Sequence, residues 1–406
     1  MNRQYAISER AHFMCPNMMF SILAKLAGPF DETVFRNVLE KLANAHPFLK
    51  AVMAFEDETG KLFYNVGPES RIRLFVYDGP FDISGYESIM KTERNIFTEG
   101  LLEVRVYRNT DNFEVLLSAH HLLTDGRGLL QLAEETADCY AGEKDPVYAE
   151  ERLIADVSEL PEGSEISGIS KLLIKCANKQ WAAENHSVDY DTYLSFEKDY
   201  HSRHDLRYVM YDVDDRTYAQ MCDLSHSNGF TVNDFLLAEM FIRTGGKKII
   251  IAADIRDKIR YFNKGSLGNY STALSIVSKK NGTDPVKMAG KLHKTVRKAV
   301  TDNKRLMLVL ACYFEMNPRL LDAAAIAGLG GFESKAAAFV GGGMFGFSKA
   351  SSYSITNLGR IENKNLMSAV FIPPASPAAI LTLGVVTVNG KMYACSGENI
   401  EKMSQI

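Results

Sequence analysis

The sequence predicts an α+β protein of two lobes. Its 406 residues exceed what one ordinary hydrophobic core holds together, so two lobes are the natural expectation. Strand-like and helix-like segments alternate along both halves, and a polar, irregular stretch from about residue 142 to 207 separates them. We therefore place an N-terminal lobe at residues 1–185 and a C-terminal lobe at residues 186–406, with the crossover near residues 180–205.

The composition argues against several classes of protein. Hydrophobic residues make up 46% of the chain and charged residues 24%, as in globular proteins. The 46 Lys and Arg against 50 Asp and Glu leave a net charge of -4 and no basic stripe, so nucleic acid is not an expected partner. Six cysteines without a CxxC spacing indicate reduced thiols of a cytoplasmic protein. Neither a signal peptide nor a transmembrane segment is expected, because no suitable apolar run is present.

The first half begins with a helix and continues with strands. Asp31 is expected to cap a helix with apolar residues at helical spacing, and Pro47 ends it. Asp111 and Asn112 form a turn between two strands, the second of which ends just before His120. The strands expected in this half are Phe48–Phe55, Leu101–Tyr107 and Phe113–Ala119.

A histidine pair follows the last of these strands, in the segment His120-His121-Leu122-Leu123-Thr124-Asp125-Gly126. Gly126 permits a tight turn, and apolar residues from Leu129 to Tyr140 predict a helix after it. Histidine, with an ordinary pKa of about 6.5, suits a group that takes a proton from an attacking hydroxyl or amine and returns it to a leaving thiol. Acyl transfer from a thioester needs no serine or cysteine nucleophile, because the donor already activates the acyl group. A buried carboxylate such as Asp125 supports the loop directly or by pairing with an arginine.

The second half predicts a buried helix and a sheet. Thr231 is expected to cap a strongly apolar helix, and Ile249–Ala253 suits the middle of a sheet. Asn389-Gly390 is a strong hairpin signal, and the weakly polar stretch Ala323–Phe347 is interpreted as packed helix plus loop. The other expected elements are a helix at Ile169–Ala183 and strands at Leu206–Val213, Ser352–Thr356, Ala369–Ile372, Leu381–Val388 and Lys391–Cys395.

The segment from His120 to Gly126 matches the HHxxxDG signature, and the chain here resembles the chloramphenicol acetyltransferase-like superfamily. That group includes nonribosomal peptide condensation domains, polyketide-associated acyltransferases, alcohol acetyltransferases and plant BAHD enzymes. The DFGWG signature of the plant branch is absent. Other segments resemble the family in the same order along nearly the whole chain, namely residues 42–50, residues 229–234, Asp254-Ile255-Arg256 with Leu267-Gly268-Asn269, and Thr356-Asn357-Leu358-Gly359.

The resemblance implies two similar lobes, each a mixed β-sheet flanked by helices, forming a pseudo-dimer around an interlobe tunnel, with one chain sufficient as a monomer. It implies that His121 is the catalytic base, while His120 and Asp125 are structural members of a site that includes Gly126. We further expect Arg256 to pair with Asp125, a solvated or locally paired arginine being the alternative. Thr356 or Asn357 is expected to face the oxyanion of the reaction.

The function expected from this resemblance is transfer of an acyl group from a coenzyme A thioester to a small-molecule alcohol or amine. One alternative is a free-standing condensation-type enzyme that takes its acyl group from the phosphopantetheine arm of an acyl or peptidyl carrier protein. Another is a non-catalytic relative that keeps the fold as a binding or docking module. No tightly bound cofactor and no metal ion is expected.

Three other motifs are weaker. Gly341–Gly346 spells GxGxxG, but poor helix material follows it, so we expect a flexible loop beside the tunnel instead of a dinucleotide site. His201–Asp205 has no cysteine or carboxylate partner at metal-ligand spacing, which favours an exposed connector over a metal site. Ser118 lies close to His120 but in no GxSxG elbow, so a hydrolase triad is not expected.

Overall fold

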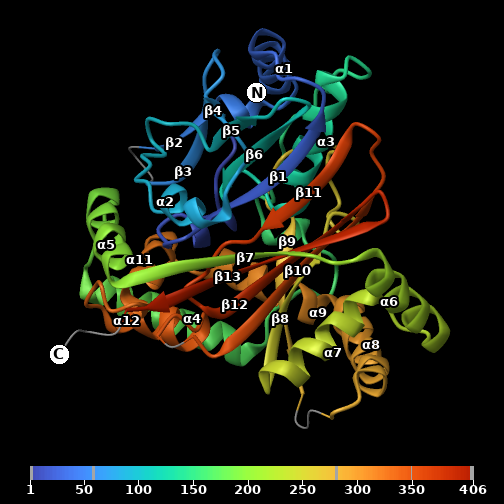
Figure 1. The fold of residues 1–406 in the computed structure, drawn as a ribbon. Helices are drawn as coiled ribbons and strands as arrows, with labels where there is room; N and C mark the ends of the chain where they lie inside the picture. The colour runs from blue at the N-terminus through green and yellow to red at the C-terminus, as the bar shows by residue number, and fades with distance from the viewer. Residues whose placement is uncertain (1–2, 57–59, 279–281, 349, 403–406) are drawn as a thin grey trace.

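Two mixed sheets dominate the structure, a computed structural model that describes residues 3–56, 60–278, 282–348 and 350–402 (Figure 1). Within these residues, a five-stranded sheet has the order β11-β1-β6-β5-β4 and a six-stranded sheet has the order β7-β13-β12-β10-β8-β9. Both sheets contain parallel and antiparallel neighbours, such as parallel β4 and β5 beside antiparallel β6. The strands of the first sheet are β1 (Met19–Ala27), β4 (Arg73–Asp78), β5 (Leu102–Arg108), β6 (Asn112–His120) and β11 (Leu366–Ile372).

The second sheet comes wholly from the second half of the chain, and β2 and β3 form a separate two-stranded sheet. The strands of the second sheet are β7 (His204–Asp212), β8 (Lys248–Asp254), β9 (Ser271–Val277), β10 (Ser352–Ile361), β12 (Ala379–Val388) and β13 (Lys391–Glu401). The small sheet consists of β2 (Ala51–Phe55) and β3 (Leu62–Val66).

Helices flank both sheets. None of those in the described ranges is long and apolar enough to cross a membrane. The helices are α1 (Glu32–Ala45), α2 (Tyr86–Met90), α3 (Gly126–Tyr140), α4 (Gly168–Glu184), α5 (Tyr190–Arg203), α6 (Asp215–Asn228), α7 (Val232–Thr244), α8 (Pro285–Thr301), α9 (Asn303–Leu306), α10 (Leu308–Glu315), α11 (Pro318–Gly328) and α12 (Lys335–Ala338).

Local signals place several elements where the sequence predicts them. The Asp31 side chain accepts a hydrogen bond from the Val34 amide and caps α1. Thr231 and Asp234 form a capping box at the start of α7. The strand predicted at Phe48–Phe55 begins only at Ala51, because the residues after Pro47 form a 3-10 turn, η2 (Pro47–Lys50).

Strand β11 shows how closely the halves are joined. It comes from the second half of the chain but pairs antiparallel with β1, with Ser21 opposite Ile372. Figure 1 shows this orange-red strand beside the blue strand β1. The first sheet therefore contains a strand from beyond the predicted lobe boundary at residues 185 and 186, and the boundary itself stays a prediction.

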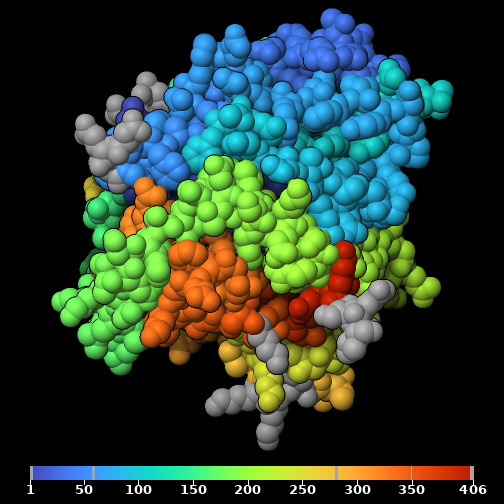
Figure 2. All heavy atoms as spheres, turned by 90° about the vertical axis from the view of Figure 1, so that its left-hand side faces the viewer, coloured from blue at the N-terminus to red at the C-terminus, as the bar shows by residue number. Residues whose placement is uncertain are grey.

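The prediction of an exposed connector at His201–Asp205 is wrong about the connector, whereas Ser202, Arg203 and Asp205 are exposed as predicted. These residues end α5 and begin β7, which pairs with β13. The His201 ring lies 2.9 Å from the Asn17 side-chain oxygen, and the His204 ring stacks on Tyr200. The two histidine rings of this stretch therefore make packed contacts, His201 with the first half and His204 within the second. In Figure 2 the green atoms around α5 lie along the boundary between the blue first half and the orange second half.

The predicted flexible loop at Gly341–Gly346 is also wrong for most of its length. Residues Phe339–Met344 form a π-helical turn, η5, that continues α12. Gly341 is required there by close packing, because a Cβ atom at this position would lie 1.8 Å from the Ala324 carbonyl oxygen in α11. Gly341 thus allows close contact with the neighbouring helix α11.

Candidate active site

Strand β6 delivers the histidine pair to the end of the first sheet, where the backbone is held on both sides. The His120 amide donates to the Leu101 carbonyl at 3.0 Å, and the His121 amide donates to the Met18 carbonyl at 2.9 Å. The chain then turns through Asp125 into α3. The predicted succession of strand, histidine pair, turn and helix is present.

His121 is partly buried, with one face of its ring covered. The ring stacks on His12 at a centroid distance of 4.2 Å and an interplanar angle of 13°, and the Phe20 ring lies 5.0 Å away. Burial lowers the pKa of His121 from its ordinary value of 6.5, although the charge of Asp125 and the residue's own backbone carbonyl act to raise it. Its Nδ1 atom is buried without a partner of hydrogen-bond geometry in the described part of the chain. The ring is therefore neutral at neutral pH, the state that a general base requires.

His120 turns toward the loop backbone. Its Nδ1 atom accepts a hydrogen bond from the Leu122 amide at 3.1 Å, so a neutral ring carries its proton on Nε2. Burial, followed by the neighbouring His121 and Arg94, lowers the pKa of His120 to about 3. The side chain thus supports the loop between the two histidines and Asp125.

Asp125 is the centre of the network that holds this loop. It caps α3 by accepting a hydrogen bond from the Gly128 amide at 3.0 Å, and it accepts another from the Tyr270 amide at 2.9 Å. The Arg256 guanidinium completes the set with two bonds of 2.9 Å, one to each carboxylate oxygen. The expected Asp125–Arg256 pair is therefore present, and it is bidentate. The Asp125 carboxylate is therefore bonded to Gly128, Tyr270 and Arg256, and not to the His121 ring.

A second loop, residues 268–270, contacts the histidine loop on the same side. The Gly268 carbonyl accepts hydrogen bonds from the Asp125 amide at 3.3 Å and from the Thr124 hydroxyl at 3.4 Å. Asn269 donates to the His12 ring, and Tyr270 donates to Asp125. His12, Asn269 and Tyr270 had no predicted role. The resemblance of residues 267–269 to the family pattern could have indicated that this loop belongs to the site. No spacing in the sequence points to His12.

Gly126 suits its position for a reason other than the one predicted. Its φ angle is not positive, so the turn itself does not demand glycine. A Cβ atom there would lie 2.7 Å from the Leu358 Cδ2 atom of β10 and 3.4 Å from the Phe371 ring of β11. Glycine therefore allows the two strands to approach the start of α3. Gly128 is similar, since its Cβ atom would lie 2.0 Å from the Thr124 hydroxyl oxygen.

The proposed oxyanion donors Thr356 and Asn357 lie on β10, next to the residue that packs on Gly126. The Asn357 side-chain oxygen accepts a hydrogen bond from the Gly359 amide at 2.8 Å, which uses it within its own strand. Arg127 of α3 donates to the Leu358 carbonyl at 2.5 Å, so β10 and the histidine loop are in contact. A role for Thr356 or Asn357 at an oxyanion stays a prediction.

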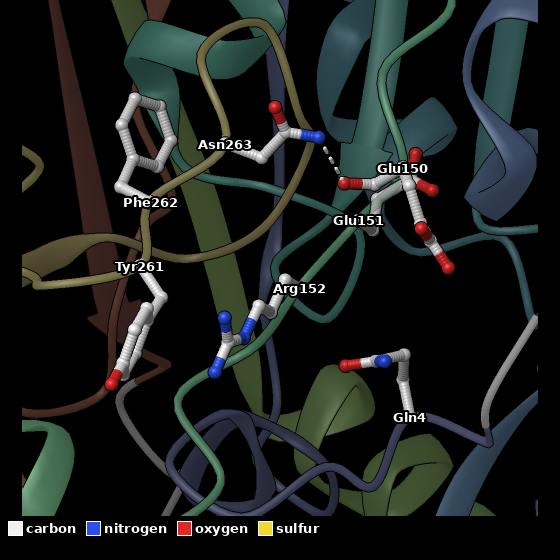
Figure 3. Close-up of a pocket in the computed structure, with 7 residues that line it drawn as sticks. All are labelled: Gln4, Glu150, Glu151, Arg152, Tyr261, Phe262 and Asn263. Atoms are coloured by element: carbon white, nitrogen blue, oxygen red, sulfur yellow. Dashed lines mark hydrogen bonds between the residues drawn. The ribbon is translucent and has the colours of Figure 1, made fainter.

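Two cavities open between segments of the two halves. One, of about 600 Å³, lies between the N-terminal segment, residues 150–152 and the loop after β8 (Figure 3). Arg152 stacks on Tyr261 at 4.0 Å there, and the Asn263 side chain donates to the Glu150 carbonyl. The other, of about 490 Å³, lies between residues 157–165 and the basic residues Lys258 and Arg260. Neither cavity is lined by His121, so the interlobe tunnel at this residue stays a prediction.

Comparisons with known proteins bear on the fold. No family model matches the sequence. A stretch of 131 residues is 30% identical to bacitracin synthase 3 of Bacillus licheniformis, and it covers 29% of this chain and 2% of that protein. The structure is similar to that of the trichothecene 15-O-acetyltransferase TRI3 from Fusarium sporotrichioides, with a TM-score of 0.60 and 12% identity over 98% of this chain and 90% of the other. It is also similar to VibH, an NRPS condensation enzyme, with a TM-score of 0.54 and 12% identity over 98% and 90% of the two chains. The chain therefore shares the two-lobed fold of these acetyltransferase and condensation structures, the fold that its sequence predicted.

Proposed function

We propose that the protein transfers an acyl group from a coenzyme A thioester to an alcohol or amine, with His121 as the general base. One observation carries the proposal: a neutral, partly accessible imidazole lies at the end of β6, in a loop that the Asp125–Arg256 pair holds in place. The fold shared with a named acetyltransferase and a named condensation enzyme supports acyl transfer in general.

In the proposed reaction, an unprotonated nitrogen of His121 takes the proton from the acceptor's hydroxyl or amine as its oxygen or nitrogen attacks the thioester carbonyl. The carbon–sulfur bond then breaks, and the imidazolium returns the proton to the departing thiolate. Each turnover thus yields one ester or amide and one free thiol. The lowered pKa of His121, caused by burial, keeps the ring unprotonated before the first step. Asp125 acts at a distance, by fixing the loop through its four hydrogen bonds.

A carrier-protein-bound acyl group is the second candidate donor. The observations that favour it are the sequence match to part of bacitracin synthase 3 and the structural similarity to VibH. The thiol that leaves would then belong to the phosphopantetheine arm, and the role of His121 would be the same. The two candidates therefore differ in the donor and share the chemistry of the site.

The test offers the full chain acetyl-, longer acyl- and aminoacyl-thioesters of coenzyme A together with pooled alcohols and amines, and follows free thiol. We expect turnover that falls roughly 10²- to 10⁴-fold in His121→Ala, because general-base catalysis is worth about that much. His226→Ala, at an exposed position of α6, is the matched control and should turn over like the wild type.

The outcomes separate the donors. Transfer from a loaded carrier protein, with none from coenzyme A thioesters, assigns the second candidate. Turnover that survives in His121→Ala removes this residue as the base. Absence of turnover from every donor rejects the enzymatic proposal and leaves the docking relative.

A further inference from the structure

A second histidine, His12, lies flat against the proposed base. It ends η1 (Glu9–His12), the short 3-10 turn ahead of β1, and is 109 residues from His121 along the chain. The two rings are nearly parallel, at 13°, with their centroids 4.2 Å apart. Ring contact at this distance restricts rotation of the His121 side chain, since tilting it would bring its atoms into His12.

The hydrogen bond of His12 defines its proton. The Asn269 Nδ2 atom lies 3.1 Å from His12 Nε2. The orientation of this amide is set by Ser271, whose backbone amide and hydroxyl both donate to the Asn269 side-chain oxygen, at 3.3 and 2.9 Å. Asn269 therefore donates, His12 Nε2 accepts, and a neutral His12 carries its proton on Nδ1.

The surroundings keep His12 in this neutral form. Burial, followed by the neighbouring rings of His121 and His120, lowers the pKa of His12 well below 6.5. A protonated Nε2 would also oppose the Asn269 donor. The ionisable groups that face the stack are His120 from β6 and Asp125 from the loop after it; the charge of Asp125 opposes the larger effect of burial, which lowers the pKa of His121. Of the two stacked rings, His121 is thus the one that can accept a proton.

A buried ion pair anchors the turn that carries His12. Arg10, two residues before it, contacts Asp322 of α11 through Nε–Oδ1 and Nη2–Oδ2 distances of 2.6 and 2.7 Å. The two side chains are 3% and 1% exposed. Two contacts with the second half of the chain therefore hold His12 in place: the Arg10–Asp322 ion pair and the hydrogen bond from Asn269.

We propose that His12 is a positioning residue: its neutral ring, oriented by Asn269, holds the plane of the His121 imidazole and leaves His121 as the only proton acceptor of the stack. This inference rests on the proposed function in so far as His121 is the base. His12 itself transfers no proton. Asn269 acts through His12 and closes a chain of contacts from the loop at residues 268–270 back to His121.

The first test reads proton positions without activity. In ¹⁵N-histidine-labelled protein with nine histidines, assigned by single substitutions, His12 should show the neutral form with the proton on Nδ1 from pH 8 to 5. Asn269→Asp replaces the donor with an acceptor, so His12 should move its proton to Nε2 and become protonated within this range. Wild-type His12 with its proton on Nε2, or titrating near pH 6.5, overturns the proposal.

The second test measures kinetics in the same variants. His12→Ala should lower kcat roughly 10-fold with KM unchanged, because the base loses its support, whereas His12→Phe keeps a flat ring and restores most of kcat. Asn269→Asp should lower kcat and move the acid limb of kcat/KM to lower pH, because an imidazolium stacked on His121 disfavours a second positive charge. The double variant with His12→Phe should lose that pH shift. His226→Ala serves as the unchanged control.

The outcomes distinguish this inference from the proposed function. Wild-type kinetics in both His12→Ala and Asn269→Asp, with His121→Ala inactive, overturn the role of His12 and leave the function standing. If the wild type turns over no donor, the function fails and the spectra decide: His121 resonances that are unchanged in His12→Ala overturn the positioning. Unfolding transitions matched to the wild type confirm that each variant is folded.

Discussion

The ion pair between Asp125 and Arg256 should be a large single contribution to the stability of the histidine loop. The informative substitution is Arg256→Met, which keeps an unbranched side chain and removes the guanidinium. Asp125 would retain the Gly128 and Tyr270 amides and lose half of its four hydrogen bonds. The carboxylate would remain buried, since only 3% of its side chain is exposed.

Two estimates bound the effect. Hydrogen bonds to a charged group contribute about 1.5–3 kcal/mol each, so two lost bonds predict about 3–6 kcal/mol. Removal of one partner of a buried pair costs about 3–5 kcal/mol. The Arg256 side chain is 16% exposed, so water can reach part of the vacated space and the lower end applies. We therefore expect the free energy of unfolding to fall by about 3 kcal/mol.

The assay is urea unfolding followed by circular dichroism and by the fluorescence of Trp181, the single tryptophan. Coincident transitions check that unfolding is one step. Asp125→Asn and the double variant complete a cycle that isolates the interaction between the two side chains. Arg243→Met is the control, because this arginine is 80% exposed and its ion pair with Glu239 should contribute less than about 1 kcal/mol. An Arg256→Met variant within about 0.5 kcal/mol of the wild type would refute the reasoning.

Three further predictions follow from the same contacts. Gly126→Ala should lower the free energy of unfolding in urea by about 1–3 kcal/mol, because its Cβ atom would lie 2.7 Å from a leucine methyl carbon. The control Gly290→Ala has open space in α8 and should be neutral or stabilising, so equal effects of the two substitutions would contradict the packing argument. Burial lowers the pKa of His121, so kcat/KM should fall only as the pH drops below 6.5, and a midpoint at or above 6.5 would count against His121 as the base. Arg10→Met should lower the free energy of unfolding by about 3–5 kcal/mol, because it leaves Asp322 buried and unpaired; a change below about 0.5 kcal/mol would show that the pair is dispensable.

Short-range patterns predicted the elements whose signals lie within a few residues. The Asp31 cap, the Thr231 capping box and the strand that ends at His120 all appear where the sequence puts them. The hairpin at Asn389-Gly390 forms with φ angles of 50° and 80°, the left-handed conformation that these two residue types tolerate. Each of these signals depends on residues that are close together in the sequence, so it can be recognised from the sequence alone.

The predictions that failed depended on neighbours distant in sequence. The segment Gly341–Gly346 looked like a flexible loop, but most of it is a π-helical turn in which the small size of Gly341 allows contact with α11. The residues at His201–Asp205 looked like an irregular connector, but they end α5 and begin β7, and His201 contacts Asn17 of the first half of the chain. The composition of a segment does not show which distant residues pack against it in the folded protein.

The sequence by itself determined the histidine motif, its strand and helix, and, through the family resemblance, the fold class; it proposed Arg256 as the partner of Asp125, and the structure decided for that pairing. Only the tertiary structure decided that β11 completes the first sheet, that Gly126 lies against Leu358 and Phe371, and that His12, itself bonded to Asn269, stacks on His121. The physical reason is separation along the chain: His12 and Asn269 are 257 residues apart, and no local pattern encodes which distant side chain will be brought against a given ring.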